Sequence, residues 1–170
     1  MKFSTPLKSI LPAAILGFVA LGLTPTSAVA QANPATTTFN VTATVLKDCI
    51  VSATALPFGN YTGAVVNASS TVTVTCTSGT TYTVGLNQGL TTGATVTTRQ
   101  MGITQPAGGL NYSLLTTSYS GANWGNTSGS WVSGTGSGAA QPLAVYGVLP
   151  AGQYVPPGSY TDTIAVTVTY

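Results

Sequence analysis

The sequence predicts an all-β protein, and three observations support this class. Beyond the first thirty residues the chain is rich in Thr, Ser, Val, Gly and Tyr, a composition that favours strands and turns. Short runs with an apolar residue at every second position recur between turn residues. Seven or so such runs at this spacing are typical of a two-sheet sandwich rather than a closed barrel.

Residues 1–30 have the three parts of a secretory signal peptide. Lys2 and Lys8 form the positive start, 10–23 is an apolar run, and Ala28-Val29-Ala30 is a small-residue cleavage site. Cleavage is expected after Ala30, with Ala32 as the second choice. The alternative is an uncleaved membrane anchor, but the apolar run is shorter than the ~20 residues that a spanning helix needs. After cleavage the chain is not expected to span a membrane.

The predicted strands follow in order along the rest of the chain. The first alternating run is 38–46, and 69–77 carries the second cysteine. The others are the runs 80–88, 93–101, 109–117, 142–150 and 160–170. In the last run, one face carries Ile164, Val166, Val168 and Tyr170, the pattern of a half-buried strand that needs a neighbour or a protected edge.

Residues 119–141 interrupt this rhythm with many Gly and Ser residues, so a mobile or weakly paired loop is expected there. Trp124 and Trp131 lie in this loop. Two readings stay open for them: they cover the core, or they are exposed and contact a sugar or a partner.

Charged groups are very scarce after residue 30: Lys47, Arg99, Asp48 and Asp162, with no Glu or His. This absence of a basic surface argues against nucleic-acid binding. Without histidine there is no Ser/His/Asp or Cys/His arrangement, and two ordinary strand-end or turn carboxylates are a poor basis for hydrolysis. We therefore expect a non-enzymatic protein with no cofactor and no metal site.

Cys49 and Cys76 are the two cysteines of the chain. In an exported protein they are expected to form a disulfide. So low a charge content also leaves few residues to prevent edge-to-edge strand pairing, which is tolerable where pairing is the purpose or a chaperone supervises it.

Several of these segments together resemble the spore coat protein U domain family, which includes subunits of archaic (Csu-type) chaperone/usher pili. The resemblance covers nearly all of residues 31–170, and its most specific elements are Cys49 with Phe58-Gly59, Val74-Thr75-Cys76, Tyr146-Gly147 and Gly158–Thr163. It implies an incomplete immunoglobulin-like sandwich at 49–170 that lacks its last strand and is completed by donor-strand complementation. Its implied partners are a periplasmic chaperone, an outer-membrane usher and other pilus subunits.

Residues 31–48 are then an N-terminal extension that contains the candidate donor strand. One face of that strand carries Phe39, Val41, Ala43 and Val45, and the acceptor groove is assigned to the C-terminal strand. The alternative is that 38–46 is simply the first strand of its own domain. The expected function is a surface pilus subunit that passes through the periplasm and supports adhesion or biofilm formation. A coat protein that forms no pilus and a secreted carbohydrate-binding module remain as alternatives.

Overall fold

The computed structural model describes residues 33–103 and 108–170. The expected signal peptide, residues 1–30, lies outside the described residues. The chain divides after Thr42 into two units. In the first unit, residues 33–42 have no regular secondary structure, and all the strands described below belong to the second unit, Ala43–Tyr170.

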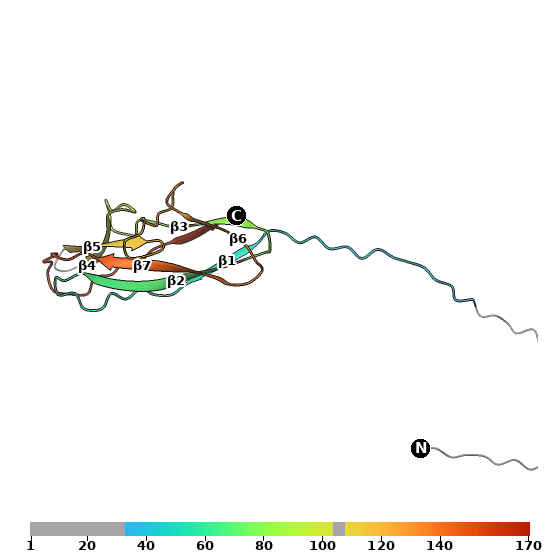
Figure 1. The fold of residues 1–170 in the computed structure, drawn as a ribbon, viewed down its shortest axis with the longest axis horizontal. Coiled ribbons are helices and arrows are strands. Elements are labelled where there is room, and N and C mark those ends of the chain that lie inside the picture. The colour runs from blue at the N-terminus through green and yellow to red at the C-terminus, as the bar shows by residue number, and fades with distance from the viewer. Residues whose placement is uncertain (1–32, 104–107) are drawn as a thin grey trace, which may run out of the picture. The chain divides into compact units, whose positions relative to one another are not determined.

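Two antiparallel sheets form the second unit (Figure 1). The larger has the order β1-β2-β7-β5-β4 and consists of β1 (Cys49–Ala53), β2 (Val66–Cys76), β7 (Gln141–Leu149), β5 (Gly108–Leu115) and β4 (Arg99–Ile103). The smaller has the order β6-β3-β8 and consists of β6 (Val132–Thr135), β3 (Thr81–Leu86) and β8 (Val166–Thr169). No helix occurs in the part that the structure describes, and the prediction of an all-β sandwich is confirmed.

The core lies between the two sheets and follows from the alternation of their strands. Every second residue is buried in the second half of β2 and along β3, because these residues face the opposite sheet. Strands β5 and β7 add further inward residues. The buried core cluster consists of Val72, Val74, Cys76, Tyr82, Val84, Leu86, Leu110, Tyr112, Leu114, Trp124, Val145 and Leu149.

Two predicted strands at the N-terminal side differ from the observed ones. Residues 38–46 form no strand, since alternation alone cannot supply a partner for the backbone groups, and the first strand begins at Cys49. In the run 93–101, only the part from Arg99 onward is a strand. Before it, the Thr95 hydroxyl accepts a hydrogen bond from the Thr98 backbone N–H at 3.1 Å, and such local bonds compete with strand pairing.

The C-terminal half also departs from expectation at two places. The Gly/Ser-rich segment contains β6, which pairs with β3. The final strand is shorter than 160–170, because Thr161 pairs with Gly102 of β4 before the chain crosses to the smaller sheet. Pairing with β3 begins where the Asn87 N–H donates to the Ala165 carbonyl at 3.1 Å, and β8 starts at the next residue.

Candidate functional site: a groove between two sheet edges

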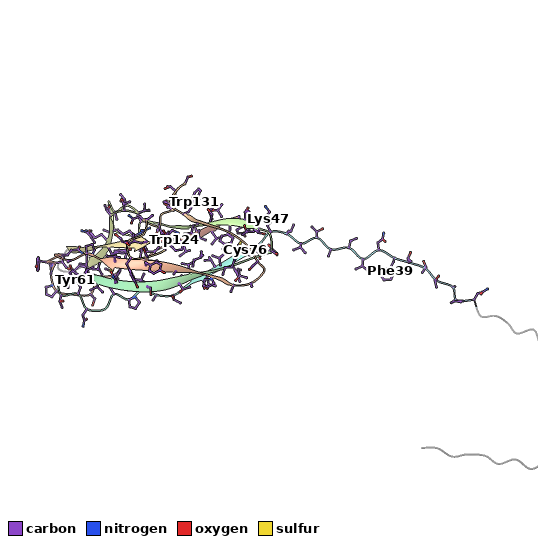
Figure 2. The ribbon with its side chains drawn as sticks, in the orientation of Figure 1. Phe39, Lys47, Tyr61, Cys76, Trp124 and Trp131 are labelled. Carbon is purple, nitrogen blue, oxygen red and sulfur yellow. A yellow bond between two sulfur atoms is a disulfide. The ribbon has the colours of Figure 1, made fainter. Side chains whose placement is uncertain are left out.

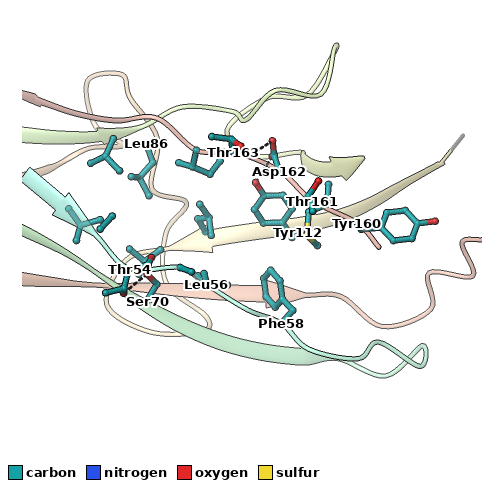
Figure 3. A pocket seen from close by; sticks show the side chains of 18 residues that line it. Thr54, Leu56, Phe58, Ser70, Leu86, Tyr112, Tyr160, Thr161, Asp162 and Thr163 are labelled. Atoms are coloured by element: carbon teal, nitrogen blue, oxygen red, sulfur yellow. Dashed lines mark hydrogen bonds between the residues drawn. The ribbon is translucent and has the colours of Figure 1, made fainter. Parts of the chain in front are cut away.

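A groove of about 430 Å³ opens between β1 and the C-terminal segment (Figure 3). Its floor is the core face of β2, β3, β5 and β7. The segment after β1 lines it with Leu56 and Phe58, and the segment before β8 lines it with Thr161, Asp162 and Thr163. β1 and β8 are both end strands of their sheets, so two sheet edges flank one opening.

The free edge of β1 exposes backbone hydrogen-bonding groups. Thr77 N–H donates to Asp48 C=O, and Thr54 N–H donates to Thr71 C=O, so the even-numbered residues from 48 to 54 bond to β2. In an antiparallel pair, the alternate residues direct their groups to the other side. The backbone groups of Cys49, Val51 and Ala53 therefore face the outer edge, where no strand pairs with them in the described part of the chain.

The same reasoning applies to β8. The bond from Asn87 N–H to Ala165 C=O sets the alternation with β3, so Thr167 and Thr169 direct their backbone groups to β3. Val166 and Val168 direct theirs to the outer edge. An extended peptide in the groove has backbone partners on both sides.

Inward-facing side chains at both edges are only partly covered. Val51 pairs with Val74, which is 0 % exposed, yet Val51 itself is 41 % exposed. Val166 and Val168 pair with the buried Leu86 and Val84, and both are only half-buried. Because paired residues share one face of a sheet, these edge residues point toward the core but lack a layer over them.

Aromatic side chains close the groove at the end away from the disulfide. The rings of Phe58 and Tyr112 meet edge to face at 6.1 Å between centroids. Leu56 and Phe58 approach the sheet closely at Gly147, where an added Cβ would lie 2.7 Å from Leu56 Cδ2 and 2.9 Å from Phe58 Cζ. Figure 3 shows Phe58 and Tyr112 facing each other across this end, with Tyr160 beyond them.

Asp162 anchors the segment that leads into β8. Its carboxylate accepts hydrogen bonds from Leu90 N–H at 2.8 Å, from Thr163 N–H at 2.8 Å and from Tyr112 Oη at 2.6 Å. Burial raises the pKa of Tyr112 well above its ordinary value, and the hydrogen bond to Asp162 and its negative charge raise it further. Tyr112 therefore remains a neutral donor to Asp162 at physiological pH.

Arg99 is 0 % exposed and lies behind this cluster. Its guanidinium donates to four backbone carbonyls, those of Asn87, Val96, Leu86 and Trp124, at 2.7–3.0 Å. Burial lowers its pKa, while the negative charge of Asp162 acts in the opposite direction. Arg99 thus joins β4, the end of β3 and the Trp124 segment, which are the elements that hold Asp162 and the start of β8.

At the other end of the groove, Cys49 of β1 and Cys76 of β2 form a disulfide. The predicted disulfide is therefore present. The Tyr170 hydroxyl lies 3.5 Å from Asp48 Oδ1 at this same end. Figure 2 shows Lys47 and Cys76 at that end of the sandwich.

The structure places the four predicted C-terminal groove residues in different surroundings. Ile164 and Val166 line the groove, and Val168 packs against the core. Tyr170 is 52 % exposed and lines a shallow depression with Trp131 on the outside of the smaller sheet.

The two tryptophans, both labelled in Figure 2, differ in their burial. Trp124 is 1 % exposed and donates its indole N–H to the Val84 carbonyl at 2.8 Å. The reading of Trp124 as a ligand contact is therefore wrong, and the alternative that it covers the core is correct. Trp131 is 39 % exposed and remains available at the surface.

The predicted donor residues are exposed. Phe39, Val41 and Val45 have 82–84 % of their surface open to solvent, and Ala43 is exposed as well. Large apolar side chains are seldom left so open in a run of four.

Sequence reasoning missed Tyr112, Arg99 and Asn87, which hold the C-terminal segment in place. The one available signal was scarcity, because Arg99 and Asp162 are two of only four charged residues beyond residue 30. Within residues 33–103 and 108–170, no group of three acidic, His or Cys residues could hold a metal ion. A helix long and apolar enough to cross a membrane is likewise not found among these residues.

Comparisons with known proteins agree with this architecture. The family model described as Spore Coat Protein U domain matches residues 35–167. Protein U of Myxococcus xanthus is 35 % identical over 157 residues, which is 83 % of this chain and 88 % of that protein.

A solved structure is also similar. It is the crystal structure of a pre-assembly complex between the chaperone CsuC and the tip adhesion subunit CsuE, from the archaic chaperone-usher Csu pili of Acinetobacter baumannii. The match has a TM-score of 0.58 and 24 % sequence identity. It covers 75 % of this chain and only 41 % of that chain, so the likeness concerns the fold of one part of the larger protein.

Proposed function

Because this chain belongs to the Spore Coat Protein U domain family, we propose that it is a structural, non-enzymatic subunit of a surface pilus assembled by the chaperone/usher route. The observation that carries the proposal is the groove with free backbone edges on both sides. A protein that must be completed by another strand fits assembly from copies or from related subunits.

The occupant of the groove in the fibre is the N-terminal extension of a neighbouring subunit. Residues 38–46 are extended in pattern, and their odd-numbered apolar side chains match a groove that is apolar at its floor. Main-chain bonds to the edges of β1 and β8 would give affinity, and alternate side chains would give specificity. Burial of each large apolar side chain contributes about 1.5–3 kcal/mol, so the joint would dissociate very slowly.

Before assembly the same groove would be occupied by a strand from a periplasmic chaperone, and an outer-membrane usher would exchange it for the extension. Export through a cleaved signal peptide at residues 1–30 brings the subunit to that compartment, and the fibre lies at the cell surface. A role in adhesion or biofilm formation is the expected use of such a fibre.

The test is a chain that lacks residues 31–46. It should still accept a donor strand but should no longer donate one, so it should cap fibres of the full-length subunit and fail to polymerise alone. A matched control is full-length chain with Thr42→Ser, which leaves the apolar face intact. If the truncated chain polymerised as well as this control, the donor-strand proposal would be wrong.

A second candidate is a spore or cell-surface coat protein that forms no pilus, which is favoured by the 35 % identity to Protein U. Electron microscopy of cells with and without the gene separates the two functions. Fibres that disappear with the gene support a pilus, and a changed coat without fibres supports the alternative.

The third candidate, carbohydrate binding, now depends on Trp131 alone. Adhesion and glycan binding of a Trp131→Ala variant test it. Unchanged binding with intact assembly would remove this function from consideration.

A further inference from the structure

The root of the extension, which is residues 46–48, is hydrogen-bonded to Thr77, the residue that follows β2. Asp48 exchanges backbone and side-chain hydrogen bonds with Thr77: Thr77 N–H donates to Asp48 C=O at 2.9 Å, and Asp48 N–H donates to Thr77 Oγ1 at 2.8 Å. The Thr77 hydroxyl lies within donor distance of two carbonyls, that of Asp48 at 3.2 Å and that of Leu46 at 3.4 Å. Thr80, which is 2 % exposed, donates its hydroxyl to Thr77 Oγ1 at 3.2 Å. These bonds continue the line of β1 backwards, past the disulfide.

This geometry restricts how the chain could fill its own groove. The segment 38–46 ends two residues before β1, so it could lie beside the free edge of β1 only after a reversal of the chain, and a reversal within residues 45–48 leaves most of the segment available for pairing. The result would be a hairpin, with the segment antiparallel to β1. The inward face of β1 is fixed by its pairs, because Cys49, Val51 and Ala53 lie opposite the buried Cys76, Val74 and Val72.

The tight hairpins put the wrong face inward. A two-residue turn at Lys47-Asp48 would place Leu46 opposite Cys49 and Thr44 opposite Val51. Partners in a hairpin share a face, so Thr42, Thr44 and Asn40 would enter the apolar groove, while Phe39, Val41, Ala43 and Val45 would face solvent. A turn at Leu46-Lys47 also directs the even-numbered residues inward, because it would place Thr44 opposite Cys49.

Three-residue turns would direct the apolar face of the segment into the groove, but they would break hydrogen bonds that the root makes. Either choice, 45–47 or 46–48, includes Leu46 in the turn and removes its contact with Thr77. Such turns also place a left-handed residue, normally glycine, at their last position. Here that position would be Lys47 or Asp48, and residues with a Cβ adopt this conformation at a cost, which is smaller for Asp than for Lys.

We propose that the length of this root and its tie to Thr77 exclude the chain's own donor segment from its groove, so that the groove stays open to a strand from a second copy. This inference rests on the proposed function and adds a property to it. In this scheme Thr77 is a positioning residue, and the number of residues between Val45 and Cys49 sets the partner choice.

Two variants whose lengths differ by one residue test which face of the segment turns toward the groove. In the first, an Asn-Gly pair replaces the three residues 46–48. Asn-Gly is favoured in two-residue hairpin turns, and such a turn brings Val45 opposite Cys49. In the second, Lys47→Asn alone, Leu46 and Asp48 stay in place, so a two-residue turn still directs the polar face inward and no glycine is supplied for a three-residue turn. The first variant also lacks Leu46 and Asp48 and therefore their contacts with Thr77, so the Lys47→Gly variants described next separate the effect of these contacts from that of the register.

The chains, from residue 31 onward, are refolded from denaturant and separated by size-exclusion chromatography with light scattering. Hydrogen exchange then reports on the amides of Val166 and Val168. The first variant should give a monomer with protected amides, and the second should polymerise like the natural sequence. The ratio of monomer to polymer should differ between them by roughly tenfold or more, the factor set by a strained turn residue.

The hydrogen bonds between the root and Thr77 are tested by Lys47→Gly, alone and combined with Thr77→Val. Glycine permits the three-residue turn, and removal of the Thr77 hydroxyl should raise the protected-monomer fraction further. Thr75→Val on the outer face of β2 is the matched control, and Thr77→Ser should restore the behaviour of Lys47→Gly alone. A merely destabilising change would lower the yield of both species and would not create a protected monomer.

The outcomes are distinguishable. Equal amounts of protected monomer from the first and second variants, or a protected monomer from the natural sequence, overturn the inference and leave donor-strand pairing in place. The same holds if the first variant polymerises like the second. If no chain polymerises and Val166 and Val168 exchange freely in all of them, both the inference and the proposed function fail.

Discussion

Tyr112 and Asp162 show how one hydrogen bond can position a strand that is short of partners. Asp162 lies where the C-terminal segment leaves its pairing with β4 and crosses to the smaller sheet. Three donors bind its carboxylate. Two of those donors are backbone amides, and the third is the buried Tyr112 hydroxyl. The cluster fixes the start of β8 before any strand enters the groove.

Tyr112→Phe is expected to lower the free energy of unfolding by about 1–3 kcal/mol, because a carboxylate loses a buried donor. It should also change the pH dependence. The folded-state pKa of Tyr112 is raised above the ordinary value of 10.0, so its contribution to stability is complete below pH 10.0 and is lost as the pH rises further. Urea unfolding between pH 7 and 11 should show a shallower alkaline decline in the variant. Tyr154→Phe, at a side chain that is 92 % exposed, is the control, and an equal effect there would contradict the assignment.

At the scale of the element, the segment that follows β1 forms one wall of the groove, although it contains no strand of its own. Leu56 and Phe58 lie against the sheet because Gly147 has no side chain at the contact. The pair Tyr146-Gly147 was among the most specific parts of the family resemblance, and the close approach gives a physical reason for glycine there.

Gly147→Ala should displace Leu56 and Phe58, since its methyl group would overlap both side chains. Overpacking of this kind costs roughly 1–3 kcal/mol. The variant should bind a synthetic peptide of residues 36–48 more weakly, as measured by isothermal titration calorimetry on chain that lacks residues 31–46. Gly102→Ala, whose Cβ would meet Thr91 Oγ1 at an ordinary 3.6 Å, is the control. Equal peptide affinity in both variants would show that this wall is not part of the binding surface.

The sequence predicted the elements whose apolar residues alternate regularly, such as β2, β3 and β7. It did not predict where pairing stops, because this depends on partners distant in the chain. The terminal segment alternates from residue 160, yet Thr161 pairs with β4 and only Val166–Thr169 pairs with β3. The cluster of Arg99, Tyr112 and Asp162 was equally inaccessible, since residues 99, 112 and 162 meet only in the folded chain.

At the scale of the whole molecule, the low charge content is related to the unpaired sheet edges. Edge strands of soluble proteins are usually protected by charged side chains, and β1 and β8 contain none. Lys47 and Asp48 lie just before β1, at the root rather than along the groove. A groove that receives a strand cannot carry such protection, so the composition is consistent with assembly as the use of these edges.

The disulfide matters more in such a molecule than in a complete sandwich, because the open groove leaves a smaller core to stabilise the fold. Cys49 and Cys76 are separated by 27 positions, and closing a loop of that length stabilises a fold by about 3–4 kcal/mol in the chain-entropy model. The double variant Cys49→Ser/Cys76→Ser should therefore accumulate poorly when exported and should unfold at lower denaturant concentration. A synthetic peptide of residues 36–48, added during refolding, should restore part of the lost stability, since filling the groove stabilises the folded state by mass action. Quantitative blotting of exported protein and urea unfolding with and without peptide measure both effects. Normal accumulation of the double variant, or a stability that the peptide leaves unchanged, would mean that the β1–β2 pairing holds the groove without the covalent link.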